Sequence, residues 1–158
     1  MGVGRIARRT FLVGSAAVAG GLAIGYYNFR RPYPNPLKRT AAKDEAVFNP
    51  YLTITPDNRI TVIVPRSEMG QGVRTTLAAL VAEELEVSLD KIRVEHGPAS
   101  WAYYNSTGLA DGGPFAKFDT GFAAETARAL FGATGKMLGL QMTGGSSSTT
   151  DAFVTMRT

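Results

Sequence analysis

The apolar residues between positions 51 and 96 follow first a strand-like and then a helix-like spacing. Two β-rich runs, Tyr51–Thr55 and Ile60–Val64, are separated by the turn formers of residues 56–59, which predicts a β-hairpin. A helix is predicted after the hairpin, because apolar residues on an Ala- and Glu-rich stretch recur every three or four positions. These residues are Val73, Leu77, Leu80, Val81 and Leu85.

A third strand is predicted after residues 88–90, which interrupt the helical pattern. Ile92 and Val94 then alternate with charged residues, as expected of a half-buried strand. The order β-β-α-β predicts an α+β fold with a short mixed β-sheet and two or three helices.

The second half of the chain is less regular. Residues 97–121 combine turn formers with aromatic residues without a clear period, which predicts a long loop that is functional or buried against a partner. A second helix is predicted next. Glycines at positions 132, 135 and 139 weaken it by roughly 1 kcal/mol each, so we expect another element to pack closely against it. The residues that mark this helix are Ala123, Ala127, Leu130, Phe131, Thr134 and Leu138.

Residues 144–158 begin as a flexible Gly-Ser loop and end in an apolar run. The N-capping candidates Ser148, Thr149, Thr150 and Asp151 predict a third helix. The sequence holds about two turns of it, fewer than an isolated helix needs. These elements are not expected to close a hydrophobic core, so we expect an incomplete part of a larger domain.

The first 46 residues are interpreted as a leader with a Pro-rich linker. The paired Arg8 and Arg9 precede an uncharged, Ala- and Gly-rich run at residues 11–27, and Arg30 and Arg31 follow it. This arrangement is typical of a twin-arginine export signal, which predicts a periplasmic protein. The apolar run also approaches the length of a membrane span. Anchoring in the inner membrane and cleavage of the signal therefore both stay open.

The basic charge of the chain lies in this leader. The net charge of the whole chain is +4, but residues 47–158, the predicted folded part, hold nine Lys or Arg against eleven Asp or Glu. A folded part with a net negative charge has no electrostatic reason to bind a phosphate backbone, which excludes nucleic acid as a partner. The chain has no cysteine, which excludes disulfides, thiolate zinc sites and iron–sulfur clusters held by this chain.

Two glycine loops carry the candidate chemistry. In the first, Gly70 and Gly72 leave room for a ligand to approach the backbone, and Gln71 between them offers one acceptor and two donors. A predicted helix starts after each loop, and the positive N-terminal end of a helix favours an anion. The second loop adds free amides and hydroxyls. Both loops suit a ligand with a polar ring system and a phosphate, although each pattern also occurs as a tight turn or a flexible linker. The second loop comprises Thr143, Gly144, Gly145, Ser146, Ser147 and Ser148.

These loops also carry a family resemblance. Residues 49–99, and above all the run from "EMGQG" through "TTLAALVAEEL", resemble the N-terminal part of the molybdopterin-binding large subunit of the xanthine dehydrogenase family. The similarity is to the branch of isoquinoline oxidoreductases and aldehyde dehydrogenases. The segment "LQMTGGSSST", residues 140–149, resembles the second glycine-serine loop of that branch. The leader and both motifs occur in the family's order.

The resemblance implies a molybdenum hydroxylase that oxidises aldehydes or N-heterocycles with water as the oxygen source. The first loop would approach the pterin and metal end of molybdopterin cytosine dinucleotide, and the second would offer amides and hydroxyls near the cofactor's oxygens. The implied partners are a small [2Fe–2S] subunit, a c-type cytochrome in many relatives, and the remainder of the large subunit. Arg66 departs from the family pattern, because relatives often have histidine there.

The family's catalytic glutamate lies far toward the C-terminus of much longer chains. No catalytic residue or metal ligand is therefore expected here, and this chain alone is expected to be inactive. Glu83 and Glu84 are interpreted as solvated carboxylates, and His96 as a hydrogen-bonded residue at a strand end. The aromatic residues of segment 101–104 either form a substrate funnel or pack against other parts of the enzyme.

A protein of another class also stays open: a non-catalytic, membrane-tethered periplasmic interaction module whose glycine loops are ordinary turns. The sequence equally allows a truncated gene, the first piece of a split subunit, or a shortened form of a longer chain. It specifies neither the substrate nor the oligomeric state.

Overall fold

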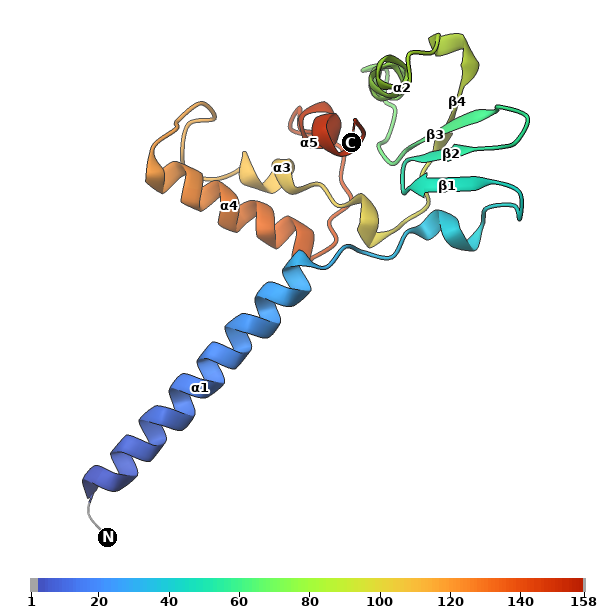
Figure 1. Cartoon of the computed structure of the whole chain (residues 1–158). Helices are drawn as coiled ribbons and strands as arrows, with labels where there is room; N and C mark the ends of the chain where they lie inside the picture. The colour runs from blue at the N-terminus through green and yellow to red at the C-terminus, as the bar shows by residue number, and fades with distance from the viewer. Residues whose placement is uncertain (1–2, 158) are drawn as a thin grey trace. The chain divides into compact units, whose positions relative to one another are not determined.

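The computed structural model describes residues 3–157, which divide into two compact units, residues 3–32 and residues 33–157. The first unit consists of one long helix, α1, Val3–Arg30 (Figure 1). Its segment Arg8–Arg30 contains a window with a mean hydropathy of 1.4, none of it buried. By length and composition this helix could cross a membrane.

The second unit is built on a four-stranded mixed sheet in the order β1-β2-β3-β4 (Figure 1). The first three strands are antiparallel neighbours, and β4 runs parallel to β3, with Val62 opposite Val94. The structure confirms the predicted hairpin, which is β2 and β3, and the predicted strand after the helix, which is β4. It also confirms the α+β class with a mixed sheet. The strands are β1, Ala46–Asn49; β2, Leu52–Ile54; β3, Ile60–Val64; and β4, Ile92–His96.

Strand β1 was not expected from the sequence, which placed a linker up to residue 46. The strand is short, alternates between exposed and half-buried residues, and pairs with β2 irregularly between Val47 and Asn49. Upstream of it, Asn35 caps a 3₁₀ turn at Pro36–Arg39, and Leu37 from this turn is buried in the core. The segment interpreted as linker therefore contributes to the folded unit.

Helix α2, Val73–Glu84, connects β3 to β4 as predicted and packs on both strands. Its residues Leu77 and Val81 are buried against Val62 and Val64 of the sheet in one hydrophobic core. Helix α5, Ser148–Thr155, and the aromatic segment after β4 add side chains to this core. The buried ring of Tyr103 is one of them. The small α+β unit is consistent with the expected part of a larger domain.

The segment of residues 97–121 is not a structureless loop, and this prediction was wrong. It contains a 3₁₀ turn at Trp101–Tyr103 and a short helix, α3, Ser106–Ala110. Both begin with a side-chain cap: Ser100 accepts from the amide of Ala102, and Asn105 accepts from the amide of Gly108. Five residues are too few to give a readable helical period.

Helix α4, Phe122–Met137, is the predicted second helix, and it packs on α3 (Figure 1). The expected close packing against its glycines is present. A Cβ atom on Gly135 would lie 3.0 Å from the carbonyl oxygen of Asn105. The orientation of the helix differs from the expected one, since Leu130 is exposed and Ala124 is buried.

Helix α5, Ser148–Thr155, is the predicted third helix. Its N-cap is Ser147, so the four residues expected as caps form the first turn instead. Within residues 3–157 the structure thus has five α-helices, more than the two or three expected.

Candidate functional site

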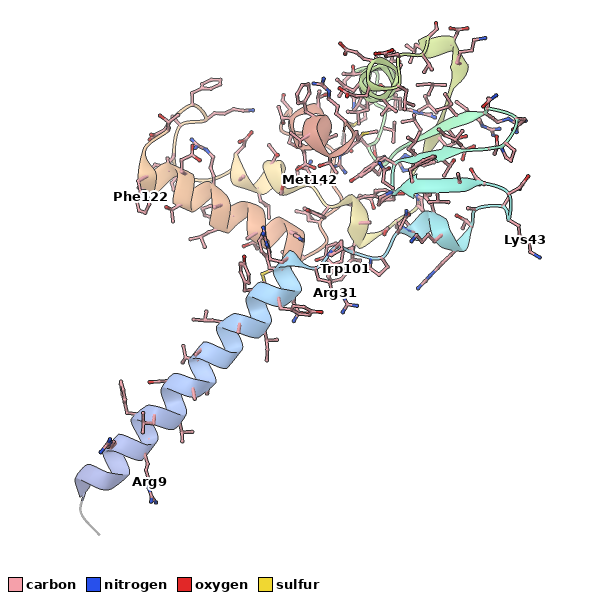
Figure 2. The ribbon with its side chains drawn as sticks, in the orientation of Figure 1. Arg9, Arg31, Lys43, Trp101, Phe122 and Met142 are labelled. Atoms are coloured by element: carbon pink, nitrogen blue, oxygen red, sulfur yellow. The ribbon has the colours of Figure 1, made fainter. Side chains whose placement is uncertain are left out.

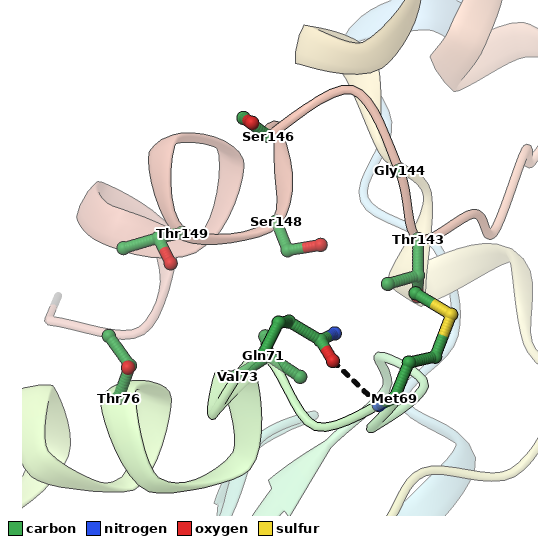
Figure 3. Close-up of a pocket in the computed structure, with 9 residues that line it drawn as sticks. All are labelled: Met69, Gln71, Val73, Thr76, Thr143, Gly144, Ser146, Ser148 and Thr149. Atoms are coloured by element: carbon green, nitrogen blue, oxygen red, sulfur yellow. Dashed lines mark hydrogen bonds between the residues drawn. The ribbon is translucent and has the colours of Figure 1, made fainter.

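The two glycine loops meet at one cavity of about 330 Å³ in the second unit (Figure 3). Its volume lies at the lower end of the range of small-molecule sites. One wall comes from the end of the first loop and the start of α2, and the other from the second loop and the start of α5. The lining residues are Met69, Gln71, Val73, Thr76, Thr143, Gly144, Ser146, Ser148 and Thr149.

The first loop holds Gln71 by its own backbone. The amide nitrogen of Met69 donates to Gln71 Oε1 at 2.6 Å (Figure 3). Gln71 Nε2 donates to the carbonyl of Ser67 at 2.8 Å. Gly70 and Gly72 have φ angles of +94° and +77°, a region that side chains disfavour. The loop thereby fixes the amide and leaves one N–H and one lone pair of Gln71 for a ligand.

Glu68 occupies the amide groups at the start of α2. Its carboxylate accepts from the backbone nitrogens of Gly70 at 2.9 Å, Gly72 at 3.0 Å and Arg74 at 3.1 Å. Hydrogen bonds from Arg74 and Gly72 lower the pKa of Glu68 below its ordinary value. From the sequence, these amides and the positive end of the helix were expected to bind an anionic ligand. In the structure they bind the carboxylate of Glu68.

The second loop is built around the buried Ser147. Its hydroxyl donates to the carbonyl of Gly144 and accepts from Nδ2 of Asn105, both at 2.7 Å. Gly145 and Ser146 have φ angles of +60° and +54°, so the chain turns sharply there. Ser148 lies across the cavity from Gln71 (Figure 3).

The structure therefore sorts the nine residues proposed from the sequence. Gln71, Thr143, Gly144, Ser146 and Ser148 line the cavity. The others shape the loops from outside that lining: Gly70, Gly72, Gly145 and Ser147. Sequence reasoning missed four lining residues, which are Met69, Val73, Thr76 and Thr149. All four lie within the two motif segments quoted above, which was the available signal for them.

Polar contacts connect the two loops to each other. The backbone nitrogen of Ser67 donates to Thr143 Oγ1 at 2.8 Å. Arg66, which directly precedes the first loop, is buried, and its Nη2 lies 3.0 Å from Asp151 Oδ2 on α5. Arg66 Nη1 also donates to the carbonyl of Tyr103 at 2.9 Å. The residue noted only as a departure from the family pattern thus lies at the centre of the site's support.

The other residues considered from the sequence lie outside this cavity. Glu83 is exposed, and Glu84 is ion-paired with Arg157 at the surface. His96 is exposed at the end of β4. Among the residues that the structure describes, no group of three or more His, Asp or Glu side chains is placed to hold a metal ion.

The aromatic segment divides between core and surface. Trp101 is exposed, whereas the hydroxyl of the buried Tyr103 donates to the carbonyl of Pro50 at 2.7 Å. The Tyr103 ring contacts Tyr51, with the ring centroids 5.4 Å apart. Burial raises the pKa of Tyr51 to about 12, although the nearby Arg66 guanidinium opposes the shift. Tyr103 therefore belongs to the core and does not line the cavity.

The comparison with known families identifies a class of cofactor-binding domain. The chain belongs to the molybdopterin cofactor-binding domain family, whose model matches residues 12–112. The match includes the first glycine loop and ends before the second. No solved structure matches the chain.

Two curated proteins are similar to the chain. The membrane-bound aldehyde dehydrogenase [pyrroloquinoline-quinone] of Gluconacetobacter polyoxogenes is 38% identical over 97 residues, which is 58% of this chain and 12% of that protein. The isoquinoline 1-oxidoreductase subunit beta of Brevundimonas diminuta is 29% identical over 106 residues, 65% of this chain and 13% of that protein. The matched segment spans about one eighth of the length of these relatives.

The lining of the cavity fits a polar heterocyclic cofactor. Gln71 supplies amide groups, and hydroxyls come from the Ser and Thr side chains of the opposite wall. A Cβ atom added to Gly144 would meet nothing within 4 Å, so the backbone there is open to a ligand. The lining contains no charged side chain, which suits recognition by hydrogen bonds of defined geometry.

Proposed function

We propose that this chain supplies part of the molybdopterin site of an oxidoreductase that oxidises aldehydes or N-heterocycles. Water would be the oxygen source, and a [2Fe–2S] subunit would accept the electrons. The observation that carries the proposal is the cavity itself, since two loops about seventy residues apart in the sequence line it from opposite sides. The names of the two relatives support the substrate classes.

Each wall of the cavity has its own part in holding the cofactor. The free N–H and lone pair of Gln71 would form hydrogen bonds with a polar edge of the pterin. The hydroxyls of Ser146, Ser148 and Thr149 would bind cofactor oxygens at the start of α5. Because Glu68 places a negative charge at the first loop, phosphate groups of the cytosine dinucleotide form would favour the second.

The cofactor, when bound, supplies the two-electron oxidation of the substrate. This chain's residues would hold and orient it. Residues that act directly on the substrate would come from other parts of the enzyme, so the chain alone would not turn over substrate. Besides the [2Fe–2S] subunit, its partners would be the remainder of the large subunit and a c-type cytochrome.

The proposed location is the periplasmic side of the inner membrane, reached by the twin-arginine route. The apolar helix α1, with Arg8 and Arg9 before its uncharged part, supports this location. The Gluconacetobacter relative is named as a membrane-bound enzyme, which also supports attachment of this chain to the membrane.

The test is a cofactor analysis of the full chain purified with its associated polypeptides from the source cells. Molybdenum is measured by mass spectrometry, the pterin by the fluorescence of its oxidised form, and pyrroloquinoline quinone by chromatography. Gln71→Ala and Ser148→Ala are each expected to lower molybdenum and pterin together. Thr75→Ala, at an exposed position on α2, is the matched control and should change neither.

The quinone measurement decides between two cofactor classes, because the name of one relative contains pyrroloquinoline quinone. Molybdenum with pterin in the purified complex supports the proposal. Quinone without molybdenum would overturn it, and so would a molybdenum content that Gln71→Ala and Ser148→Ala leave unchanged.

A further inference from the structure

Helix α4 is covered on one side only. Its small residues Ala124, Gly132 and Gly135 are buried, and the two glycines lie against the backbone of α3. Among the described elements, α3 is the one that makes extensive contact with α4. A helix of 16 residues thus rests on a partner helix of five, which leaves most of its circumference to solvent.

The uncovered side of α4 is uncharged along its whole length and carries three large apolar residues. Phe122 is 88% exposed, Leu130 66% and Met137 63%, and their spacing of eight and seven residues places them on one helix face. Alanine and threonine fill the positions between them on this face. We name this surface, defined by Phe122, Leu130 and Met137, the α4 face. In Figure 2 the Phe122 side chain stands at the outer end of the helix.

The three charged residues of α4 lie away from this face. The ammonium group of Lys136 lies over the ring of Tyr104. Glu125 and Arg128 form an ion pair with an N–O distance of 3.0 Å. Arg128 also donates to the carbonyls of Ala116 and Asp119, and so holds the preceding loop against the helix. That loop presents Phe118, which is 90% exposed. Phe118 thereby adds a second exposed apolar group to this part of the chain, as is common at interaction surfaces.

We propose that the α4 face is the surface on which a further part of the same molybdopterin-binding subunit packs. The proposal rests on the proposed function. The two curated relatives extend far beyond the matched segment, which is about one eighth of their length, so each contains ample chain for such a contact. An uncharged stripe of about four helical turns fits an apolar helix or sheet face of a permanently associated part.

The absence of charge on the α4 face also argues against other occupants. Soluble carriers that bind transiently use charged patches to steer their encounter, and the face defined here offers none.

The experiment is photo-crosslinking in the source cells, with the full chain at its natural level. The crosslinker p-benzoylphenylalanine replaces Leu130 in one variant and Met137 in another. A third variant carries it at Glu83, which is exposed on α2, as the control. Crosslinked peptides are identified by mass spectrometry. The same yield is measured after Met137→Lys in the Leu130 variant, where we expect a decrease of about tenfold or more.

The expected result is a crosslink from both α4 positions, but not from Glu83, to a polypeptide similar to the large-subunit relatives outside the segment matched here. Crosslinks to a second copy of this chain, to a polypeptide without that similarity, or at no more than the control level would overturn the proposal. Pterin in the crosslinked complex is measured separately. Its absence, with the expected crosslink present, would overturn the proposed function and not the α4 surface.

Discussion

Arg66 and Asp151 form a buried ion pair, with 3.0 Å between Nη2 and Oδ2 and side-chain exposures of 2% and 10%. Arg66 directly precedes the first glycine loop, and Asp151 lies in the first turn of α5, after the second. Asp151 Oδ1 also accepts from the backbone nitrogens of Ser106 and Thr107 at the start of α3. One carboxylate thus fixes both walls of the cavity and the helix that supports α4.

Replacement of Arg66 by alanine is expected to lower the free energy of unfolding by about 3–5 kcal/mol, because it leaves the Asp151 charge buried without its partner. Urea unfolding of the full chain in detergent measures this change. Arg59→Ala is the matched control. Its pair with Asp57 is exposed at 58% and 61%, so its loss should change the free energy of unfolding far less than the loss of Arg66. Equal effects of the two substitutions would contradict a structural role of the buried pair.

Glu68 should make the first loop sensitive to acid. The folded state lowers its pKa, so the carboxylate stabilises the loop fully above the ordinary glutamate pKa, and this stabilisation is lost as the pH falls through the lowered value. Hydrogen exchange of the Gly72 and Arg74 amides, corrected for intrinsic rates, should accelerate in acid. In Glu68→Gln the protection should be weaker at neutral pH and vary less with pH. Identical pH profiles of the two proteins would refute the assignment.

The sequence was sufficient to predict those helices and strands whose apolar residues recur at a regular helical or strand spacing. Apolar residues from Val73 to Leu85 predicted α2, and the strands on either side of Pro56–Arg59 predicted the hairpin, since local spacing determines which face is buried. The same holds for the candidate cavity. Each loop could be found from its glycines, and Gln71 and Ser148 do line one cavity. Their binding role stays a prediction.

The remaining features depend on contacts between distant residues. Arg66 and Asp151 are 85 positions apart, and nothing in either local pattern pairs them. The occupation of the α2 amides by Glu68 depends on the positive φ angles of the loop. The buried side of α4 could not be predicted from its local pattern either. Its small glycines pack against α3, and its larger apolar residues are exposed.

Two glycines of α4 should respond oppositely to alanine. At Gly135 the new Cβ would lie 3.0 Å from the carbonyl oxygen of Asn105 and 3.3 Å from Ser106 Cα, both backbone atoms. We expect a loss of about 1–3 kcal/mol from this overpacking. At Gly132 the nearest atom lies at 3.6 Å, so alanine should stabilise the helix by up to about 1 kcal/mol. Thermal unfolding compares the two variants. The same sign for both would show that α3 does not pack on α4 as described.

Ser146 and Ser147 separate ligand contact from loop support, although they are neighbours. Ser147 is buried, and its hydroxyl bonds both Gly144 and Asn105. Ser147→Ala should therefore cost about 1–3 kcal/mol of stability, because it removes a buried hydrogen-bonding partner. Ser146 is exposed and lines the cavity. Ser146→Ala should leave the unfolding free energy within about 0.5 kcal/mol and still lower the pterin content of the purified complex.

The two measurements on this pair have opposite expected outcomes, which makes them decisive together. Unfolding reports on the network under the loop, and pterin content reports on the surface above it. Stability lost in Ser146→Ala would mean that this hydroxyl supports the loop. Full pterin content in Ser146→Ala would remove Ser146 from the proposed contacts and leave Ser148 and Thr149 as the hydroxyl donors of that wall.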